Sequence, residues 1–187
     1  AEGLGKREFD CVIDVSAYTL TDDVKPFLDL MSGRIGHYVF VSSTGLYTSP
    51  STLPVREGVR VDRAAQTPYG WNKLDVEEHL FREYQKGGTP ATTIAISMVF
   101  GPHNNILDRE QRMFARFLSG RPVLVPGDGN TLGQIGHVDD QSRAIRMMLC
   151  NPVTFGKRYN VTGNDYFTDN LYIDTFAHVI GNSPARI

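Results

Sequence analysis

The stretch TPYGWNK at residues 67–73 places a phenol and an amine, Tyr69 and Lys73, four residues apart. The apolar spacing of the LDVEEHLFREYQ run that follows predicts a helix over 69–86, and residues four apart lie on one face of a helix. A lysine ammonium beside a phenol stabilises the phenolate and lowers the phenol pKa from about 10 toward neutrality. Such a tyrosine can take or give a proton at working pH. A YxxxK pair alone also occurs by chance in many helices.

A second polar group ends the apolar run YVFVSS, where Ser42, Ser43 and Thr44 supply hydroxyls. Nearly unbroken apolar runs at 11–17, 38–43 and 93–101 predict strands buried on both faces, as in a parallel sheet. Ligands bind at the carboxyl ends of strands in open α/β sheets. The order of hydroxyl-rich strand end, YxxxK pair and a further strand running into FGP is much more specific than any one of its parts.

Helical patterns at 22–33 and 69–86 alternate with these strands, so we expect a Rossmann-like, doubly wound parallel α/β sheet. The rest of the chain changes character and predicts a smaller, mixed C-terminal lobe. Its expected elements are a helix at 109–120, a short strand in RPVLVPGDG, a helix at 137–150 capped by Asp139 or Asp140, a strand in RYNVTG and a helix in NLYIDTFAHVIG. We predict a division into 1–102 and 103–187, the second part unable to fold alone.

Composition fits a soluble globular protein, since 41% of the 187 residues are hydrophobic and 21% are charged. The net charge of −2 and the lack of a basic block give no indication of nucleic-acid or membrane binding. Cys11 and Cys150 have no CxxC neighbours, which favours a reducing compartment, and we expect a cytoplasmic protein without a disulfide framework. The five histidines are scattered, so no metal site is predicted.

The ordered motifs VIDVSA, VSSTGLY, PYGWNK, SMVFGP and PGDG…HVDD together resemble the extended short-chain dehydrogenase/reductase family, the NAD-dependent epimerase/dehydratases. The resemblance covers nearly the whole chain. It implies that Tyr69 is the catalytic acid–base and that Lys73 binds the nicotinamide ribose and lowers the tyrosine pKa. It also implies that Ser43, four residues before Tyr47, hydrogen-bonds the reacting oxygen.

The same resemblance implies NAD or NADP as cofactor, bound by the 1–102 part, and a small-molecule substrate bound by the 103–187 part. The cofactor residues would be Val15, Ser16, Ala17, Tyr69, Lys73 and Ser97. The substrate residues would be Thr44, Met98, His103 and Asn104.

Several positions depart from the family pattern. The Gly-rich turn GxxGxxG that holds the pyrophosphate is absent, so we expect this chain to lack the first part of the fold, to be inactive alone and to expose a sheet edge. Two alternatives follow for the isolated chain: a homo-oligomer that pairs through this edge, or a fragment of a larger ordered molecule. Gly133 stands where sugar-nucleotide epimerases carry a phosphate-binding arginine, and Met98 replaces a frequent asparagine. Thr44 and Gly45 replace the acid pair of the 4,6-dehydratases, which argues against that reaction.

Two functions remain open. The first is an oxidoreductase or epimerase that acts on a sugar-like or small hydroxyl substrate, an activity that the resemblance implies for a longer parent protein. The second is an RNA-binding or regulatory protein that reuses the fold, because PGDG…LGQIGHVDD resembles an atypical branch of the family that includes the chloroplast stem-loop binding proteins.

Overall fold

A computed structural model describes residues 4, 6–48, 53–104, 106, 110–183 and 185–187. The chain forms two compact units. The first comprises 1–97 and 139–161, and the second comprises 98–138 and 162–187. The path therefore leaves the first unit, returns to it and leaves it again.

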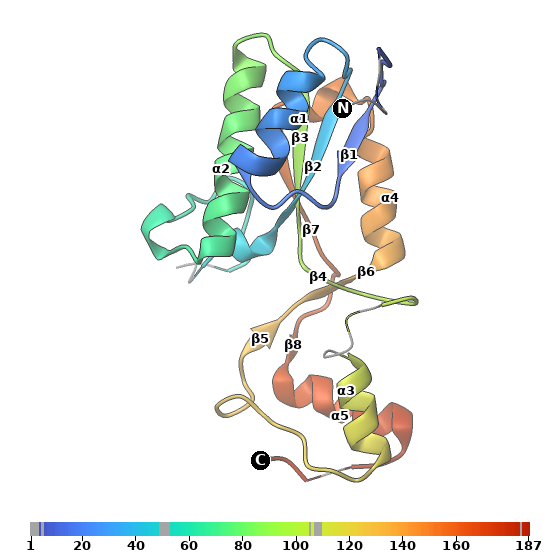
Figure 1. Cartoon of the computed structure of the whole chain (residues 1–187). Helices are drawn as coiled ribbons and strands as arrows, with labels where there is room; N and C mark the ends of the chain where they lie inside the picture. Colours follow the sequence, from blue (N-terminus) through green and yellow to red (C-terminus); the bar gives the residue numbers. More distant parts are fainter. Residues whose placement is uncertain (1–3, 5, 49–52, 105, 107–109, 184) are drawn as a thin grey trace. The chain divides into compact units, whose positions relative to one another are not determined.

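The first unit is built on a four-stranded sheet in the order β1-β2-β3-β7, and every neighbouring pair is parallel (Figure 1). The strands are β1 (Val12–Asp14), β2 (Tyr38–Ser43), β3 (Ala91–Ile96) and β7 (Lys157–Val161). β2 and β3 are almost wholly buried, as their unbroken apolar runs predict. The predicted Rossmann-like α/β class is confirmed.

Helices cover both faces of this sheet. Alternate residues of β2 point to opposite faces, and those on each face pack against a helix. Tyr38 and Phe40 pack in a core with Val76 and Leu80 of α2. Val39 and Val41 pack on the other side with Met148 of α4. The helices of this unit are the π-helical turn η1 (Leu20–Val24), α1 (Lys25–Leu30), α2 (Pro68–Gln85) and α4 (Val138–Met148).

The second unit is smaller and mixed. Strand β4 (Met98–Phe100) pairs parallel with β6 (Ile135–His137), and β5 (Leu132–Gly133) pairs antiparallel with β8 (Phe167–Thr168). Its helices are α3 (Glu110–Leu118) and α5 (Asp169–Ile180). They share a small core around Phe117, Val123 and Ile173.

Some predicted elements are wrong in detail. The expected strand at 93–101 divides at Ser97 into β3 and β4, which belong to different sheets. RPVLVPGDG forms an isolated bridge between Val123 and Arg186 instead of a strand. Asp139 and Asp140 lie in the first turn of α4 and do not cap it, although carboxylates there still complement the helix dipole.

The grouping of segments also differs from the sequence-based division at 102/103. β7 lies beside β3 in the main sheet, and α4 packs on that sheet, so 139–161 belongs to the first unit. Lys157, Arg158 and Asn160 give β7 a polar sequence that does not read as a buried central strand. Its assignment depends on pairing with a strand more than sixty residues earlier in the chain.

Candidate active site

The helix α2 starts at the candidate site. Thr67 is its N-cap, with its hydroxyl accepting the Gly70 N–H at 3.2 Å, and Pro68 stands in the first turn. This start exposes Tyr69, whose side chain is 41% accessible. The Tyr69 ring lies against Tyr18 with 5.9 Å between ring centroids. The N-terminus of α2 thus presents a phenol to solvent at a fixed place.

One turn deeper, Lys73 is almost fully buried, at 6% exposure. Its Nζ donates to the carbonyl oxygens of Ala17 at 2.9 Å and Val41 at 3.1 Å. The ammonium also lies 4.6 Å from the centroid of the Phe40 ring and 5.9 Å from that of Tyr69. Burial lowers the pKa of Lys73, while the charge of Asp14 opposes that shift. The amine is therefore anchored close to the phenol.

Ser43 ends β2 and faces the same space as Tyr69. Its Oγ accepts the Gly45 N–H at 3.0 Å and caps the turn η2 (Thr44–Leu46). A β-carbon added at Gly45 would lie 3.2 Å from Ser43 Oγ and 3.9 Å from Tyr69 Cε1. Both side chains therefore border Gly45. The structure brings together Ser43, Tyr69 and Lys73 as well as Thr44, which follows Ser43 directly.

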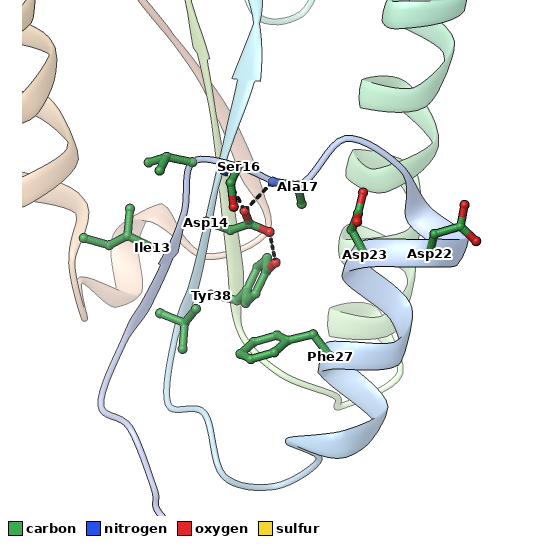
Figure 2. Close-up of a pocket in the computed structure, with 10 residues that line it drawn as sticks. Ile13, Asp14, Ser16, Ala17, Asp22, Asp23, Phe27 and Tyr38 are labelled. Carbon is green, nitrogen blue, oxygen red and sulfur yellow. Dashed lines mark hydrogen bonds between the residues drawn. The ribbon is translucent and has the colours of Figure 1, made fainter. Parts of the chain in front are cut away.

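Val15, Ser16 and Ala17 line an open pocket of about 470 Å³ at the carboxyl end of β1 (Figure 2). Asp14 organises this turn, since its Oδ1 accepts the N–H groups of Ser16 at 3.1 Å and Ala17 at 2.8 Å. Its other oxygen accepts a short hydrogen bond from the Tyr38 hydroxyl. Burial and the bond to Asp14 raise the pKa of Tyr38 above its usual value.

Asp14 and Lys73 are linked through a single residue. The Ala17 N–H donates to Asp14 while the Ala17 carbonyl accepts from Lys73. Asp14 therefore holds the turn that helps to hold the lysine. The sequence reasoning missed this role, although a signal exists, because Asp14 is the one carboxylate inside the otherwise apolar run CVIDVSA.

Ser97 closes the first unit at the end of β3. It is buried, its N–H donates to the Val161 carbonyl at 3.1 Å, and its Oγ has no hydrogen-bond partner among the described residues. The remaining predicted substrate residues, Met98, His103 and Asn104, belong to the second unit. Met98 is exposed on β4, and His103 has a left-handed backbone with φ of 65°. Asn104 donates to Glu110.

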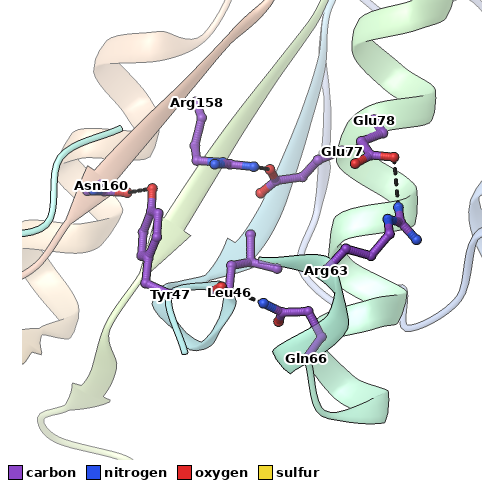
Figure 3. Close-up of polar contacts among 8 residues, drawn as sticks. All are labelled: Leu46, Tyr47, Arg63, Gln66, Glu77, Glu78, Arg158 and Asn160. Carbon is purple, nitrogen blue, oxygen red and sulfur yellow. Dashed lines mark hydrogen bonds and ion pairs between the residues drawn. The ribbon is translucent and has the colours of Figure 1, made fainter. Parts of the chain in front are cut away.

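A buried ion pair supports α2 from the sheet side (Figure 3). Arg158 Nε on β7 donates to Glu77 Oε2 at 2.6 Å, and Glu77 has no exposed surface. Burial raises the pKa of Glu77, and the charge of Arg158 counteracts that shift. Nearby, the Tyr47 hydroxyl donates to Asn160 Oδ1 at 2.9 Å, and Gln66 Nε2 donates to the Leu46 carbonyl at 2.8 Å. These bonds hold Tyr47, just after β2, and Gln66, just before α2, in place.

Among the described residues, no group of three or more His, Cys, Asp or Glu side chains could hold a metal ion. In the same part of the chain, none of the helices has the length and apolar character needed to cross a bilayer.

The described fold is a parallel α/β sheet with a Tyr–Lys pair in the first turns of α2, and comparison with known proteins identifies the family. The model of the NAD dependent epimerase/dehydratase family matches residues 22–162, and the chain belongs to this family.

Among curated relatives, the chain is 30% identical over 165 residues to the chloroplast stem-loop binding protein of 41 kDa b of Arabidopsis thaliana, covering 88% of this chain and 41% of the relative. Among solved structures, it resembles the UDP-glucuronic acid 4-epimerase of Bacillus cereus in complex with NAD. That match has a TM-score of 0.72 and 22% identity, and it covers 82% of this chain and 49% of the epimerase.

A second solved structure, the dTDP-glucose 4,6-dehydratase of Bacillus anthracis in complex with NAD, matches with a TM-score of 0.76 and 19% identity. It covers 95% of this chain and 60% of the dehydratase. The chain thus spans about half the length of these relatives. At such identities the structural likeness establishes the fold alone.

Proposed function

We propose that this chain carries the catalytic half of an NAD(P)-dependent oxidoreductase or epimerase that acts on a sugar-like or small hydroxyl substrate. The observation that carries the proposal is Lys73, a buried amine one helical turn from an exposed phenol and bordered by the Ser43 strand end. Burying a lysine is costly, and here two carbonyls offset that cost. A site for a ligand explains why the charge is placed there.

The residues fit the ribose and nicotinamide end of such a cofactor. Two of the three N–H groups of Lys73 are bound to carbonyls, which leaves the third to donate to a ribose hydroxyl. Val15, Ser16 and Ala17 border a pocket of about 470 Å³, and Ser97 offers a buried hydroxyl that has no hydrogen-bond partner within the described part of the chain. When bound, the nicotinamide supplies hydride transfer with a carbon of the substrate.

The chain's own residues move the proton. Tyr69 takes it from a substrate hydroxyl, or returns it, while the nearby Lys73 ammonium stabilises the phenolate. Ser43 Oγ accepts the Gly45 N–H, and because a hydroxyl both accepts and donates, its own hydrogen can be donated to the reacting oxygen. Thr44 stands next to it as a further substrate contact. This assignment gives Ser43, Tyr69 and Lys73 their three roles.

Position 133 in the second unit argues against a sugar-nucleotide substrate. Epimerases of that type would use an arginine at this position to bind the substrate's diphosphate. A β-carbon at Gly133 would lie 2.8 Å from Cε2 of the Phe167 ring, so a side chain there would require that ring to move. The place of an arginine, a bidentate phosphate donor, is thus taken by the aromatic ring of Phe167. Met98, His103 and Asn104 are the proposed substrate residues of this unit.

The direct test is a titration of the chain with NADH and with NADPH, followed by the fluorescence of Trp71, two residues from Tyr69. We expect saturable quenching that is weaker than for a complete cofactor site, because the sequence has no Gly-rich phosphate turn, and Tyr69→Phe should keep this binding. Lys73→Met should weaken binding. If neither cofactor binds at millimolar concentration, the proposal fails for this chain.

A second candidate is binding of a structured RNA, favoured by one observation, the 30% identity to a chloroplast stem-loop binding protein. Phosphate contacts require clustered Lys and Arg, and the net charge of −2 does not supply an overall attraction. An RNA hairpin titrated at several salt concentrations separates the two candidates. Affinity that falls steeply with salt, without cofactor binding, would favour RNA.

A further inference from the structure

The two cysteines of the chain lie 139 positions apart in sequence, yet they meet in the first unit. Cys11 directly precedes β1, and Cys150 directly follows the last turn of α4. The Cys150 thiol donates to the carbonyl of Asp10, the neighbour of Cys11, with 3.5 Å between sulfur and oxygen. Nothing in their spacing along the chain indicates this pairing.

His37, the residue before β2, forms hydrogen bonds to the backbone beside both cysteines. The Cys150 N–H donates to His37 Nδ1 at 3.1 Å, and the Val12 N–H, next to Cys11, donates to the His37 carbonyl at 2.8 Å. The His37 Nε2 lies 2.9 Å from Thr92 Oγ1, and the ring has no exposed surface. His37 therefore bonds to Cys150 through its side chain and to Val12, the neighbour of Cys11, through its backbone carbonyl, which restrains the relative position of the two cysteines.

The two thiols differ in their surroundings. Cys11 packs against the core that contains Val39, Val41 and Met148, whereas Cys150 is exposed. Burial raises the pKa of the Cys11 thiol to about 11, and the neighbouring Cys150 thiol adds to that shift. One thiol is thus accessible to solvent reagents, and the other is held beside it.

The backbone at Cys150 is left-handed, with φ of 52°. Glycine or asparagine is the usual residue at such a position after a helix, because other side chains are strained there. The chain nevertheless has a cysteine at this position, and it lies close to Cys11.

We propose that Cys11 and Cys150 form a reversible intramolecular disulfide that fastens the start of β1 to the end of α4. β1 is an edge strand of the four-stranded sheet and pairs with β2. Its other end carries Asp14 and the 15–17 turn of the pocket. The disulfide fastens the strand that lines the candidate site.

The reaction needs a disulfide oxidant, for which glutathione disulfide is the probe. The Cys150 thiolate attacks one of its sulfurs, forming a mixed disulfide and releasing one glutathione thiolate. Cys11, after losing its proton, attacks the Cys150 sulfur and releases the second glutathione thiolate. Two protein thiols are oxidised, one glutathione disulfide is reduced to two thiols, and the two protons that the protein thiols lose pass through solvent to the two glutathione thiolates.

The test equilibrates the wild-type chain with mixtures of reduced and oxidised glutathione, in buffer and in concentrated urea. After acid quenching, intact mass and peptide mapping separate the dithiol, the mixed disulfide and the Cys11–Cys150 disulfide. The ratio gives an effective concentration of the two thiols. We expect it to be at least about tenfold higher in the native chain than in urea, because the fold has already closed the loop between them.

Cys150→Asn is the matched control, because asparagine tolerates the left-handed backbone. It should leave Cys11 slow to react and abolish the internal disulfide. The native chain itself can overturn the proposal. Accumulation of a stable mixed disulfide at Cys150, interchain dimers, or an equal effective concentration in buffer and urea would each show that the fold does not pair these thiols.

Discussion

Lys73 and Tyr69 belong to one sequence motif but differ in burial and in hydrogen bonding. The lysine is buried and bonded to two carbonyls, whereas the tyrosine is exposed and free to meet a ligand. Replacing this lysine by an apolar side chain removes the cost of burying a charge but leaves two carbonyls without their donor, so the two effects on stability oppose each other. Stability should therefore change little at position 73, whereas ligand affinity should fall.

The first prediction follows from that contrast. Lys73→Met should change the free energy of unfolding by no more than about 1 kcal/mol, since methionine fills the same space without a buried charge. The same variant should lower affinity for NADH or NADPH by at least tenfold. Urea unfolding and the fluorescence titration measure the two effects. Tyr69→Phe serves as the control with intact affinity, and a strong loss of stability without loss of affinity would contradict the assignment.

The second prediction concerns pH. Burial lowers the pKa of His37, and its Nδ1 must be unprotonated to accept the Cys150 N–H. The unfolded chain therefore binds more protons than the folded chain below the ordinary histidine value of about 6.5. The free energy of unfolding should fall as pH drops below about 6.5 and on through the lower folded pKa, by up to about 1.4 kcal/mol per pKa unit of difference.

Urea unfolding from pH 8 to pH 5 measures this effect. His37→Gln keeps a hydrogen-bonding side chain without titration and should flatten the curve. Burial also lowers the pKa of His79, so His79→Gln is the necessary comparison. A wild-type slope that disappears only in the His79 variant would reject the role of His37.

At the level of elements, the local sequence pattern predicted those helices and strands whose start and length are set by neighbouring residues. Helix α2 was predictable because Thr67 and Pro68 start it and its apolar residues keep helical spacing. The run at 93–101 gave no sign of its break at Ser97, since both halves are apolar. The bridge of Val123 depends on Arg186 near the chain's end, so local sequence could not distinguish it from a strand.

The third prediction tests the ion pair that joins α2 to β7. Arg158→Met should reduce the free energy of unfolding by about 3–5 kcal/mol, because it leaves the Glu77 carboxylate buried without its partner. Adding Glu77→Leu to that variant should restore most of the loss. A double-mutant cycle by urea unfolding measures both. If the double variant is as unstable as the single one, the cost lies in packing and not in the unpaired charge.

At the scale of the molecule, the residues predicted for the site fall in both units, each of which is described by itself. Ser43, Thr44, Tyr69, Lys73, Ser97 and the 15–17 turn belong to the first, and Met98, His103 and Asn104 belong to the second. The motifs identified these residues in chain order, but chain order could not reveal that 139–161 returns to the sheet. That return is a non-local pairing, visible only when β3 and β7 stand side by side (Figure 1).

The last prediction uses this path. The fragment 103–187, expressed alone, should not fold, because β7 loses its partner β3 and α4 loses the apolar face of Val39, Val41 and Ile94.

A chain in which 98–138 is joined to 162–187 by a short Gly-Ser linker should keep the helices α3 and α5. Their core around Phe117, Val123 and Ile173 lies within those segments, and the Gly163 N–H already bonds to the Ile135 carbonyl at 2.9 Å. Circular dichroism and amide dispersion in NMR spectra compare the two. A folded 103–187 fragment would mean that α4 and β7 do not depend on the first unit, whereas an unfolded linked chain would mean that the second unit depends on it too.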